Sequence, residues 1–219
     1  MKKEIRVMIF DMDGVILDSE PLHELAREQM FEKYGIAGAQ DLPNPVGRST
    51  CGFWQLVLAK YGMEGDPRVF EREHYELVSK LVVEKKLPPS QGLLPLLDWA
   101  RERGIKRAIA SSSTRKLVYT VLEHLNLAAY FDGVACGDEV ENKKPAPDVY
   151  LRALSLVGAD AAHAAAVEDS SSGIEAAHAA GLRCFGYHNL TSGIQDLSKA
   201  DWQVEHLKEI QELLLQEHI

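Results

Sequence analysis

The sequence predicts an α/β fold, in which a doubly wound parallel sheet carries an α-helical insertion directly after its first strand. Short apolar runs of strand length alternate with helical stretches through most of the chain, a pattern typical of parallel sheets with crossover helices. Residues 18–87 break this alternation, because they show helical spacing and no strand character. Polar residues follow directly on several predicted strands, which places candidate chemistry at one edge of the sheet.

The first strand is predicted at residues 7–10. Four consecutive apolar residues there run into Asp11, Met12, Asp13 and Gly14. A short apolar run that ends in a turn signal is typical of a strand buried on both faces. Because ligands of open α/β sheets bind beyond the carboxyl ends of the strands, Asp11 and Asp13 are predicted to lie at a crevice.

The stretch that follows predicts a separate helical unit. Its first helix is expected to begin at Ser19 or Glu20 and to end at Gly35. Two more helices are expected at residues 53–61 and 69–84, because their apolar residues recur at helical spacing.

Beyond this insertion the alternation of strands and helices resumes. Strands are predicted at residues 106–110, 131–136, 164–167 and 182–187. The helices between and after them are predicted at 93–103, 117–125, 149–157 and 173–180, with a last helix around 207–214. The sequence therefore predicts an α/β core domain formed by residues 1–17 and 88–219, and a helical cap domain formed by residues 18–87.

The composition is that of an ordinary globular protein and argues against some partners. The chain has 219 residues, and 33 acidic against 24 basic side chains give a formal net charge of −9. This balance disfavours nucleic acid or an anionic membrane surface as the main partner. No apolar run is long enough to span a membrane, no signal-peptide pattern is present, and the three cysteines stand in no metal-binding spacing. We therefore expect a cytoplasmic monomer with buried, reduced thiols and a small-molecule substrate.

Four features with chemical potential fall at the predicted carboxyl edge of the sheet. They are Asp11 with Asp13, Ser111, Lys144, and Glu168 with Asp169. Each has an ordinary alternative, since a serine after a strand is often a helix N-cap, a loop lysine is usually solvated, and Asp169 could cap the following helix. Because the carboxyl ends of parallel strands meet at one edge, we expect the four features to converge on one crevice.

This set of side chains meets the requirements of in-line phosphoryl transfer. Acidic groups at buried strand ends need a cation, and Mg²⁺ suits carboxylate and phosphate oxygens. The expected ligands are Asp11, Glu168, Asp169 and the backbone of Asp13. Asp11 would then act as the nucleophile, and Asp13 would transfer protons. The hydroxyl of Ser111 and the ammonium group of Lys144 would bind the phosphate.

The chain resembles the haloacid dehalogenase superfamily in four stretches, FDMDGVILDS, IASSS, KKPAPD and VEDSSSG, which match the four motifs of that superfamily in order. The resemblance spans nearly the whole chain, and no motif position departs from the pattern. It implies a helical cap after the first strand and an aspartyl-phosphate intermediate on Asp11. It also implies that Asp13 protonates the leaving alkoxide and then activates the hydrolytic water. True dehalogenases of the superfamily lack an acid at the position of Asp13, so dehalogenation is not implied.

Further positions resemble the substrate-facing residues of this superfamily. They are Asp18, Glu20, His23 and Arg48 in the cap, and Ser112 and Ser113 on the core side. An isolated loop arginine is usually solvated, and His23 could simply be a polar helix position, so their roles stay open here. The short cap resembles that of sugar-phosphate phosphatases. We therefore favour a Mg²⁺-dependent phosphatase whose substrate is a small phosphorylated metabolite, a sugar phosphate.

Two alternatives remain open. β-Phosphoglucomutase, which transfers phosphate between sugar hydroxyls, shares all four motifs and a cap histidine. It carries an aromatic residue one helical turn after that histidine, where this chain has Arg27. A non-catalytic module of the same fold is the second alternative. Such a module would have lost an essential acid, and none of the motif acids is missing here.

Overall fold

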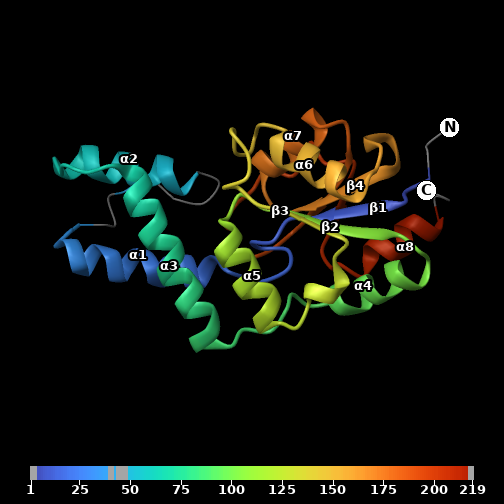
Figure 1. Cartoon of the computed structure of the whole chain (residues 1–219), viewed down its shortest axis with the longest axis horizontal. Helices are drawn as coiled ribbons and strands as arrows, with labels where there is room; N and C mark the ends of the chain where they lie inside the picture. Colours follow the sequence, from blue (N-terminus) through green and yellow to red (C-terminus); the bar gives the residue numbers. More distant parts are fainter. Residues whose placement is uncertain (1–3, 39–41, 43–48, 217–219) are drawn as a thin grey trace.

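A parallel sheet forms the centre of the computed structural model, which describes residues 4–38, 42 and 49–216. Among these residues, six strands lie in the order β3-β2-β1-β4-β5-β6 (Figure 1). The strands are β1 (Val7–Phe10), β2 (Lys106–Ala110), β3 (Gly133–Ala135), β4 (Ala164–Glu168), β5 (Arg183–Tyr187) and β6 (Trp202–Val204). The order reverses at β1, because β2 and β3 lie on one side of it and the later strands on the other. Such a reversal opens a crevice at the carboxyl ends of the two central strands, β1 and β4.

Both faces of the sheet are covered, so the side chains of β1 alternate between two apolar cores. Met8 and Phe10 pack into one core, and Val7 and Ile9 into the other. The first face carries α4 (Leu93–Glu102), α5 (Arg115–His124) and α8 (Glu209–Gln216), and the second carries α6 (Asp148–Val157) and α7 (Ser171–Ala179) (Figure 1). This arrangement confirms the predicted doubly wound α/β class.

Three helices lie beyond the carboxyl ends of the strands and pack on one another. They are α1 (Glu20–Tyr34), α2 (Thr50–Tyr61) and α3 (Pro67–Lys85) (Figure 1). They enclose an apolar core of their own around Trp54, which is fully buried against Phe53, Val57 and Phe70. The first of these helices ends at Gly35, whose φ of 65° is the left-handed conformation that favours glycine. The inserted helices therefore stand over the end of the sheet where β1 and β4 deliver their last residues.

Some element boundaries differ from the predicted ones. The strand expected at 131–136 shortens to β3, because residues Ala128–Tyr130 form a 3₁₀ turn just before it. The strand β6 was not predicted, since it has three residues at the sheet edge and Gln203 is exposed between its neighbours. All three cysteines are free, but only Cys136 and Cys184 are buried, whereas Cys51 is partly exposed.

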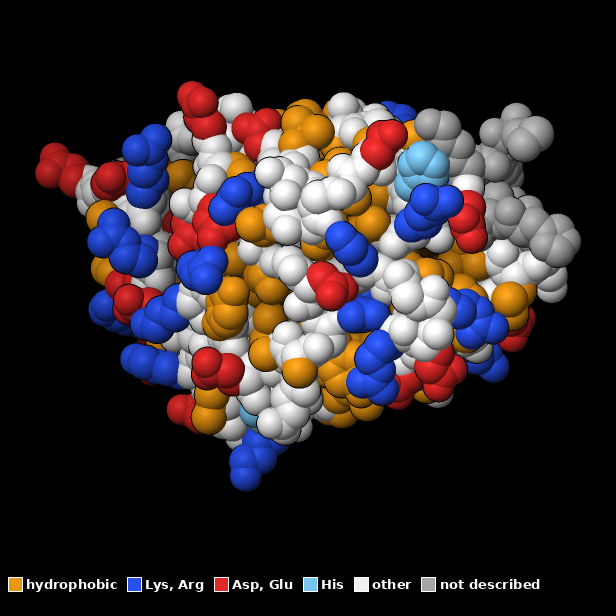
Figure 2. Space-filling view, turned by 45° about the vertical axis from the view of Figure 1, so that its right-hand side comes forward, with side chains coloured by type: hydrophobic (Ala, Val, Ile, Leu, Met, Phe, Trp, Pro, Cys, Tyr) orange, Lys and Arg blue, Asp and Glu red, His pale blue; other side chains and the backbone are white. Residues whose placement is uncertain are grey.

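Charges of both signs are mixed over the surface seen in Figure 2, with apolar side chains between them. No helix within the described ranges combines the length and the apolar character needed to cross a membrane. One cluster of carboxylates lies at the strand ends. It consists of Asp11, Glu168 and Asp169, each of which has a carboxylate oxygen within 4.8 Å of those of the other two.

Candidate active site

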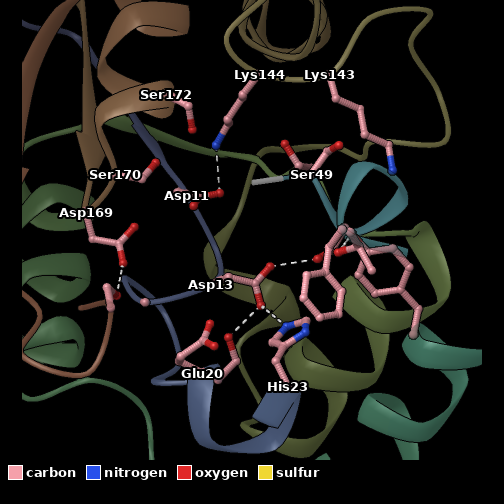
Figure 3. Close-up of a pocket in the computed structure, with 18 of the residues that line it drawn as sticks. Asp11, Asp13, Glu20, His23, Ser49, Lys143, Lys144, Asp169, Ser170 and Ser172 are labelled. Atoms are coloured by element: carbon pink, nitrogen blue, oxygen red, sulfur yellow. Dashed lines mark hydrogen bonds and ion pairs between the residues drawn. The ribbon is translucent and has the colours of Figure 1, made fainter. Parts of the chain in front are cut away.

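A cavity of about 190 Å³ lies between the strand ends and the inserted helices. The core contributes Asp11, Asp13, Lys144 and Asp169 to its wall, among others, and the inserted helices contribute Glu20, His23, Arg27, Thr50, Phe53, His74 and Tyr75 (Figure 3). The polar groups of the core side come from the loops after β1, β2, β3, β4 and β5, as expected for a crevice at the carboxyl edge of a parallel sheet.

Asp11 is held at the end of β1 by a buried lysine. Nζ of Lys144 lies 2.8 Å from Oδ1 of Asp11 and 2.6 Å from Oε1 of Glu168, and it also donates to the backbone carbonyl of Ala110 (Figure 3). Burial alone lowers the pKa of Lys144, but the two carboxylates outweigh this effect and raise the pKa above its usual value. Lys144 is therefore a fixed positive charge beside the Asp11 carboxylate.

Glu168, the last residue of β4, is completely buried and anchors this lysine. Its Oε1 also accepts a hydrogen bond from the hydroxyl of Tyr150 at 2.6 Å, and its Oε2 accepts one from Ser170 at 3.1 Å. Gly173 makes this packing possible, because a Cβ at that position would lie 1.9 Å from Oε2 of Glu168. Both oxygens of Glu168 are thus engaged by protein donors.

Asp169 faces Asp11 across the strand end. Its Oδ2 accepts a short hydrogen bond from Ser192, a buried residue of the loop after β5. Gly14 lets the first loop approach, because its φ is 81° and a Cβ there would lie 1.8 Å from the same oxygen. Burial, together with the charges of Asp11 and Glu168, raises the pKa of Asp169 well above its usual value.

The residues present fit a divalent cation. Three buried carboxylates share one ammonium group, Lys144, and burial raises the pKa of Asp11 to about 7 against the opposing effect of that lysine. Asp11 and Asp169 each keep one carboxylate oxygen that accepts no hydrogen bond from the described residues. A hard divalent ion with oxygen ligands would offset the excess negative charge, which is the chemistry expected of Mg²⁺.

Asp13 is surrounded by hydrogen-bond donors rather than by carboxylates. Its Oδ1 lies 2.6 Å from the hydroxyl of Ser19 and 3.3 Å from Nε2 of His23, and its Oδ2 lies 2.7 Å from the hydroxyl of Ser113 (Figure 3). Burial alone raises the pKa of Asp13, but the hydrogen bonds from His23, Ser19 and Ser113 outweigh it and lower the pKa to about 2. Asp13 is therefore poised as a proton acceptor.

Arg27 and Lys143, the cations on the cap side of the cavity among the described residues, already have carboxylate partners. Arg27 pairs with Glu20 at 2.7 Å, and Lys143 pairs with Glu71 of α3 at 2.8 Å. The second pair joins the loop after β3 to the inserted helices and lies over the ring of Tyr75. Polar but uncharged side chains, including Ser49 and Thr50, complete this part of the wall.

The predicted substrate residues fall into three groups. Glu20, His23, Ser112 and Ser113 line the cavity. Ser111 and Asp18 do not line it: Ser111 is fully buried and accepts a hydrogen bond from the Ser113 amide, and Asp18 accepts one from Thr191. The N-cap of the helix after β2 is Thr114 rather than Ser111. The third group is Arg48, which lies outside the described residues.

Sequence patterns did not single out several residues of the site. Ser19, His74, Tyr150 and Ser192 each contact a site residue through contacts that only the tertiary fold creates. Ser19 was expected only as a helix start, and its side chain makes no cap hydrogen bond because it donates to Asp13 instead. No local signal in the sequence marks the other three.

Comparison with known proteins agrees with this geometry. The profile of the haloacid dehalogenase-like hydrolases matches residues 8–187, a range that includes Asp11, Asp13, Lys144, Glu168 and Asp169. The chain belongs to this family. It is therefore a haloacid dehalogenase-like hydrolase, as the four motifs predicted.

Individual relatives indicate which members of this family the chain resembles. A phosphorylated carbohydrates phosphatase of Thermotoga maritima is 32% identical over 192 residues, covering 86% of this chain and 88% of that protein. Fructose-1-phosphate phosphatase YqaB of Escherichia coli is 33% identical over 178 residues, covering 80% of this chain and 92% of that protein. Among solved structures, β-phosphoglucomutase of Clostridium difficile superposes with a TM-score of 0.80 at 25% identity and covers 97% of this chain and 96% of its own. The similarities thus include both phosphatases and a mutase.

Proposed function

We propose that this hydrolase is a Mg²⁺-dependent phosphatase of a small phosphorylated metabolite, a sugar phosphate, and that it acts through an aspartyl-phosphate on Asp11. The observation that carries the proposal is the placement of Asp11 at the cavity wall, beside the fixed charge of Lys144 and opposite Asp169. A carboxylate nucleophile, a cationic clamp and an acidic cluster are the parts that in-line phosphoryl transfer needs. Two of the relatives, a phosphorylated carbohydrates phosphatase and a fructose-1-phosphate phosphatase, support the substrate class.

In the first step, a carboxylate oxygen of Asp11 attacks phosphorus, and the bond between phosphorus and the sugar oxygen breaks. The leaving oxygen takes a proton from Asp13, which lies two residues further along the same loop. Asp13 must hold that proton when the substrate is bound. A phosphate group beside it favours this, because a neighbouring negative charge raises the pKa of a carboxyl group.

In the second step, a water molecule gives its proton to Asp13 and attacks the phosphorus of the aspartyl-phosphate. Phosphate leaves, the Asp11 carboxylate is restored, and Asp13 is again protonated. The donors around Asp13 support this step, because they stabilise the carboxylate that accepts the proton. The chain's own residues thus account for every proton that moves.

The predicted metal ligands are Asp11, Glu168, Asp169 and the backbone of Asp13. Mg²⁺, when bound, supplies positive charge to the phosphoryl oxygens. Asp11 and Asp169 fit best as direct ligands, because each keeps an oxygen free of hydrogen bonds from the described residues, whereas Glu168 is engaged at both oxygens. Lys144 remains proposed to bind the transferred phosphoryl group. Ser112 or Ser113, which line the cavity, take the role first proposed for Ser111, because Ser111 is fully buried and does not line the cavity.

The cap side of the cavity supports a neutral, hydroxyl-rich leaving group. Arg27 and Lys143, the cations there among the described residues, are each paired with a glutamate. A second phosphate would have to compete with those carboxylates, whereas sugar hydroxyls could bond to Glu20, Thr50 and similar polar groups. We therefore place the insertion, residues 18–87, as the cap domain that selects the sugar.

The mutase remains a second candidate, because the C. difficile structure resembles this chain over almost its full length. A mutase must take up a bisphosphorylated intermediate and shield its aspartyl-phosphate from water. The paired cations on the cap side favour the phosphatase.

The test is phosphate release from a panel of hexose and pentose phosphates, with Mg²⁺ or with EDTA. Asp11→Asn should abolish release, and Asp160→Asn, an amide replacement in a turn at the opposite edge of the sheet, should retain it. The panel includes β-glucose 1-phosphate with a trace of glucose 1,6-bisphosphate. Glucose 6-phosphate formed without phosphate release would identify the mutase. Absence of Mg²⁺-dependent turnover on every substrate, including p-nitrophenyl phosphate, would contradict both enzymes and favour a non-catalytic module.

A further inference from the structure

Two histidines of the inserted helices form a chain of contacts that ends on Asp13. Nε2 of His23, on α1, lies 3.3 Å from Oδ1 of Asp13 (Figure 3). Nδ1 of the same ring lies 2.8 Å from Nε2 of His74, on α3, and the two rings are stacked with centroids 5.1 Å apart. His74 is 1% exposed, and its remaining nitrogen, Nδ1, is buried with no hydrogen-bond partner in the described part of the chain.

The direction of these hydrogen bonds follows from donor and acceptor counting. The Asp13 carboxylate only accepts, so Nε2 of His23 must carry a hydrogen to bond to it. If His23 is neutral, its Nδ1 is then an acceptor, and Nε2 of His74 must be the donor. The unpartnered Nδ1 of His74 is left as a bare acceptor.

The two other arrangements are less favourable. In the first, a neutral His23 donates from Nδ1 to His74 and turns the lone pair of Nε2 toward the Asp13 carboxylate, so that the contact with Asp13 becomes repulsive. In the second, His23 is an imidazolium, and His74 must accept at Nε2 and carry its hydrogen on the buried Nδ1. Buried N–H groups without a partner are rarer in proteins than buried acceptors without one.

We propose that His74 is a positioning residue, which donates to Nδ1 of His23 and so holds His23 in the tautomer whose Nε2–H bonds to Asp13. The proposal rests on the role of Asp13 in the proposed phosphatase. His74 lies between α1 and α2, against the rings of His23 and Trp54, so its own position is set by packing. Burial keeps the pKa of His74 well below its usual value, and the ring therefore stays neutral.

The contacts extend across the boundary between the inserted helices and the sheet. Asp13 belongs to the loop after β1, whereas His23 and His74 belong to α1 and α3. The donor that prepares Asp13 for proton transfer is therefore in place only when the inserted helices stand in the position seen here. Because His74 lies on α3, the hydrogen bond from His23 to Asp13 depends on the position of α3 as well as on that of α1.

A matched pair of variants separates the hydrogen bond from packing. His74→Gln keeps an N–H donor near the position of Nε2, whereas His74→Met has similar length and no donor. His206→Met, at an exposed histidine near the C-terminus, is the control for the substitution itself. We expect kcat for a sugar phosphate to fall about tenfold in His74→Met and to stay within about twofold in His74→Gln, with KM nearly constant in both.

The tautomer of His23 is measured directly by long-range ¹H–¹⁵N correlation spectra of ¹⁵N-histidine-labelled protein. The chain has 8 histidines, and the His23 signal is identified by its loss in His23→Gln. The proposal requires the Nε2–H tautomer in the wild type and in His74→Gln, and a mixed or inverted tautomer in His74→Met.

Three results would overturn the role of His74. They are a wild-type His23 found as the Nδ1–H form or as an imidazolium, a tautomer unchanged in His74→Met, and equal losses of kcat in the methionine and glutamine variants. The wild-type spectrum decides the first point even if His74→Met does not fold. A wild type without phosphatase activity would instead overturn the proposed function, while the spectra would still decide whether His74 sets the tautomer of His23.

Discussion

The acidic cluster predicts an unusual pH dependence of stability for the metal-free protein. Asp11 has a pKa of about 7 in the folded state because of its burial, compared with 3.8 for an unperturbed aspartate. The folded state therefore binds more protons at this site than the unfolded state between these two pH values. Stability from this site is fully present below pH 4 and is lost as the pH rises towards 7. Replacing Asp11 by asparagine removes the effect.

The magnitude follows from the shift of about three pH units. At about 1.4 kcal/mol per unit, the free energy of unfolding of the wild type should fall by up to about 4 kcal/mol relative to Asp11→Asn across the whole window. About 2.5 kcal/mol of this change should appear between pH 5 and pH 8. The assay is urea unfolding followed by circular dichroism in EDTA at several pH values in that range, with Asp160→Asn as the matched amide control.

Added Mg²⁺ supplies the second half of this test. A cation bound at the cluster favours the carboxylate form of Asp11. Mg²⁺ should therefore remove most of the difference between the wild type and Asp11→Asn in how the free energy of unfolding changes with pH, and it should stabilise the wild type more at pH 8 than at pH 5. A difference between wild type and Asp11→Asn that is flat with pH, or that grows in favour of the wild type as the pH rises, would refute this account of the cluster.

The remaining predictions concern neighbours of the nucleophile. Asp169→Asn should raise the Mg²⁺ concentration needed for half-maximal activity at least tenfold, and an unchanged titration would remove Asp169 from the metal site. Gly14→Ala should lower kcat more than tenfold and reduce the melting temperature, because the added Cβ would lie 1.8 Å from a carboxylate oxygen of Asp169. Wild-type values of kcat and melting temperature would contradict this prediction, because they would show that the loop can shift to accommodate the Cβ. Ser113→Ala removes a donor to the Asp13 carboxylate and so raises its pKa. Because Asp13 must hold its proton when the substrate is bound, the basic limb of the pH–rate profile should move up by about one unit, and a shift downward would contradict the role of this hydrogen bond.

The core of the site was predictable because strand ends in a parallel sheet converge. Asp11, Lys144 and Asp169 lie on segments far apart in sequence, yet each follows a strand whose apolar run is visible in the sequence. The rule that carboxyl ends meet at one edge then brings them together without any knowledge of the rest of the fold.

Contacts made by the inserted helices could not be predicted in this way. His74 meets His23 across 51 residues, and their pairing depends on how α1 and α3 rotate against each other. Ser192 reaches Asp169 from a loop that has no motif of its own. Asp18 lies next to the predicted cap helix but points to Thr191, because the turn of the backbone there, and not spacing, decides its direction. The strand β6 was not predicted, because three residues at a sheet edge are too few to show a periodic pattern.

The most direct test of the central claim is to trap the phosphoryl group on Asp11. In Asp13→Asn the first step should survive with p-nitrophenyl phosphate, whose leaving group needs no proton, whereas the second step should be slow because no base activates water. The variant is mixed with this substrate and Mg²⁺, quenched in acid, and analysed by peptide mass spectrometry. We expect one burst equivalent of p-nitrophenol and one phosphoryl group on the peptide that contains Asp11. A phosphoryl group on another residue, or a wild-type rate of steady turnover with none, would contradict the account.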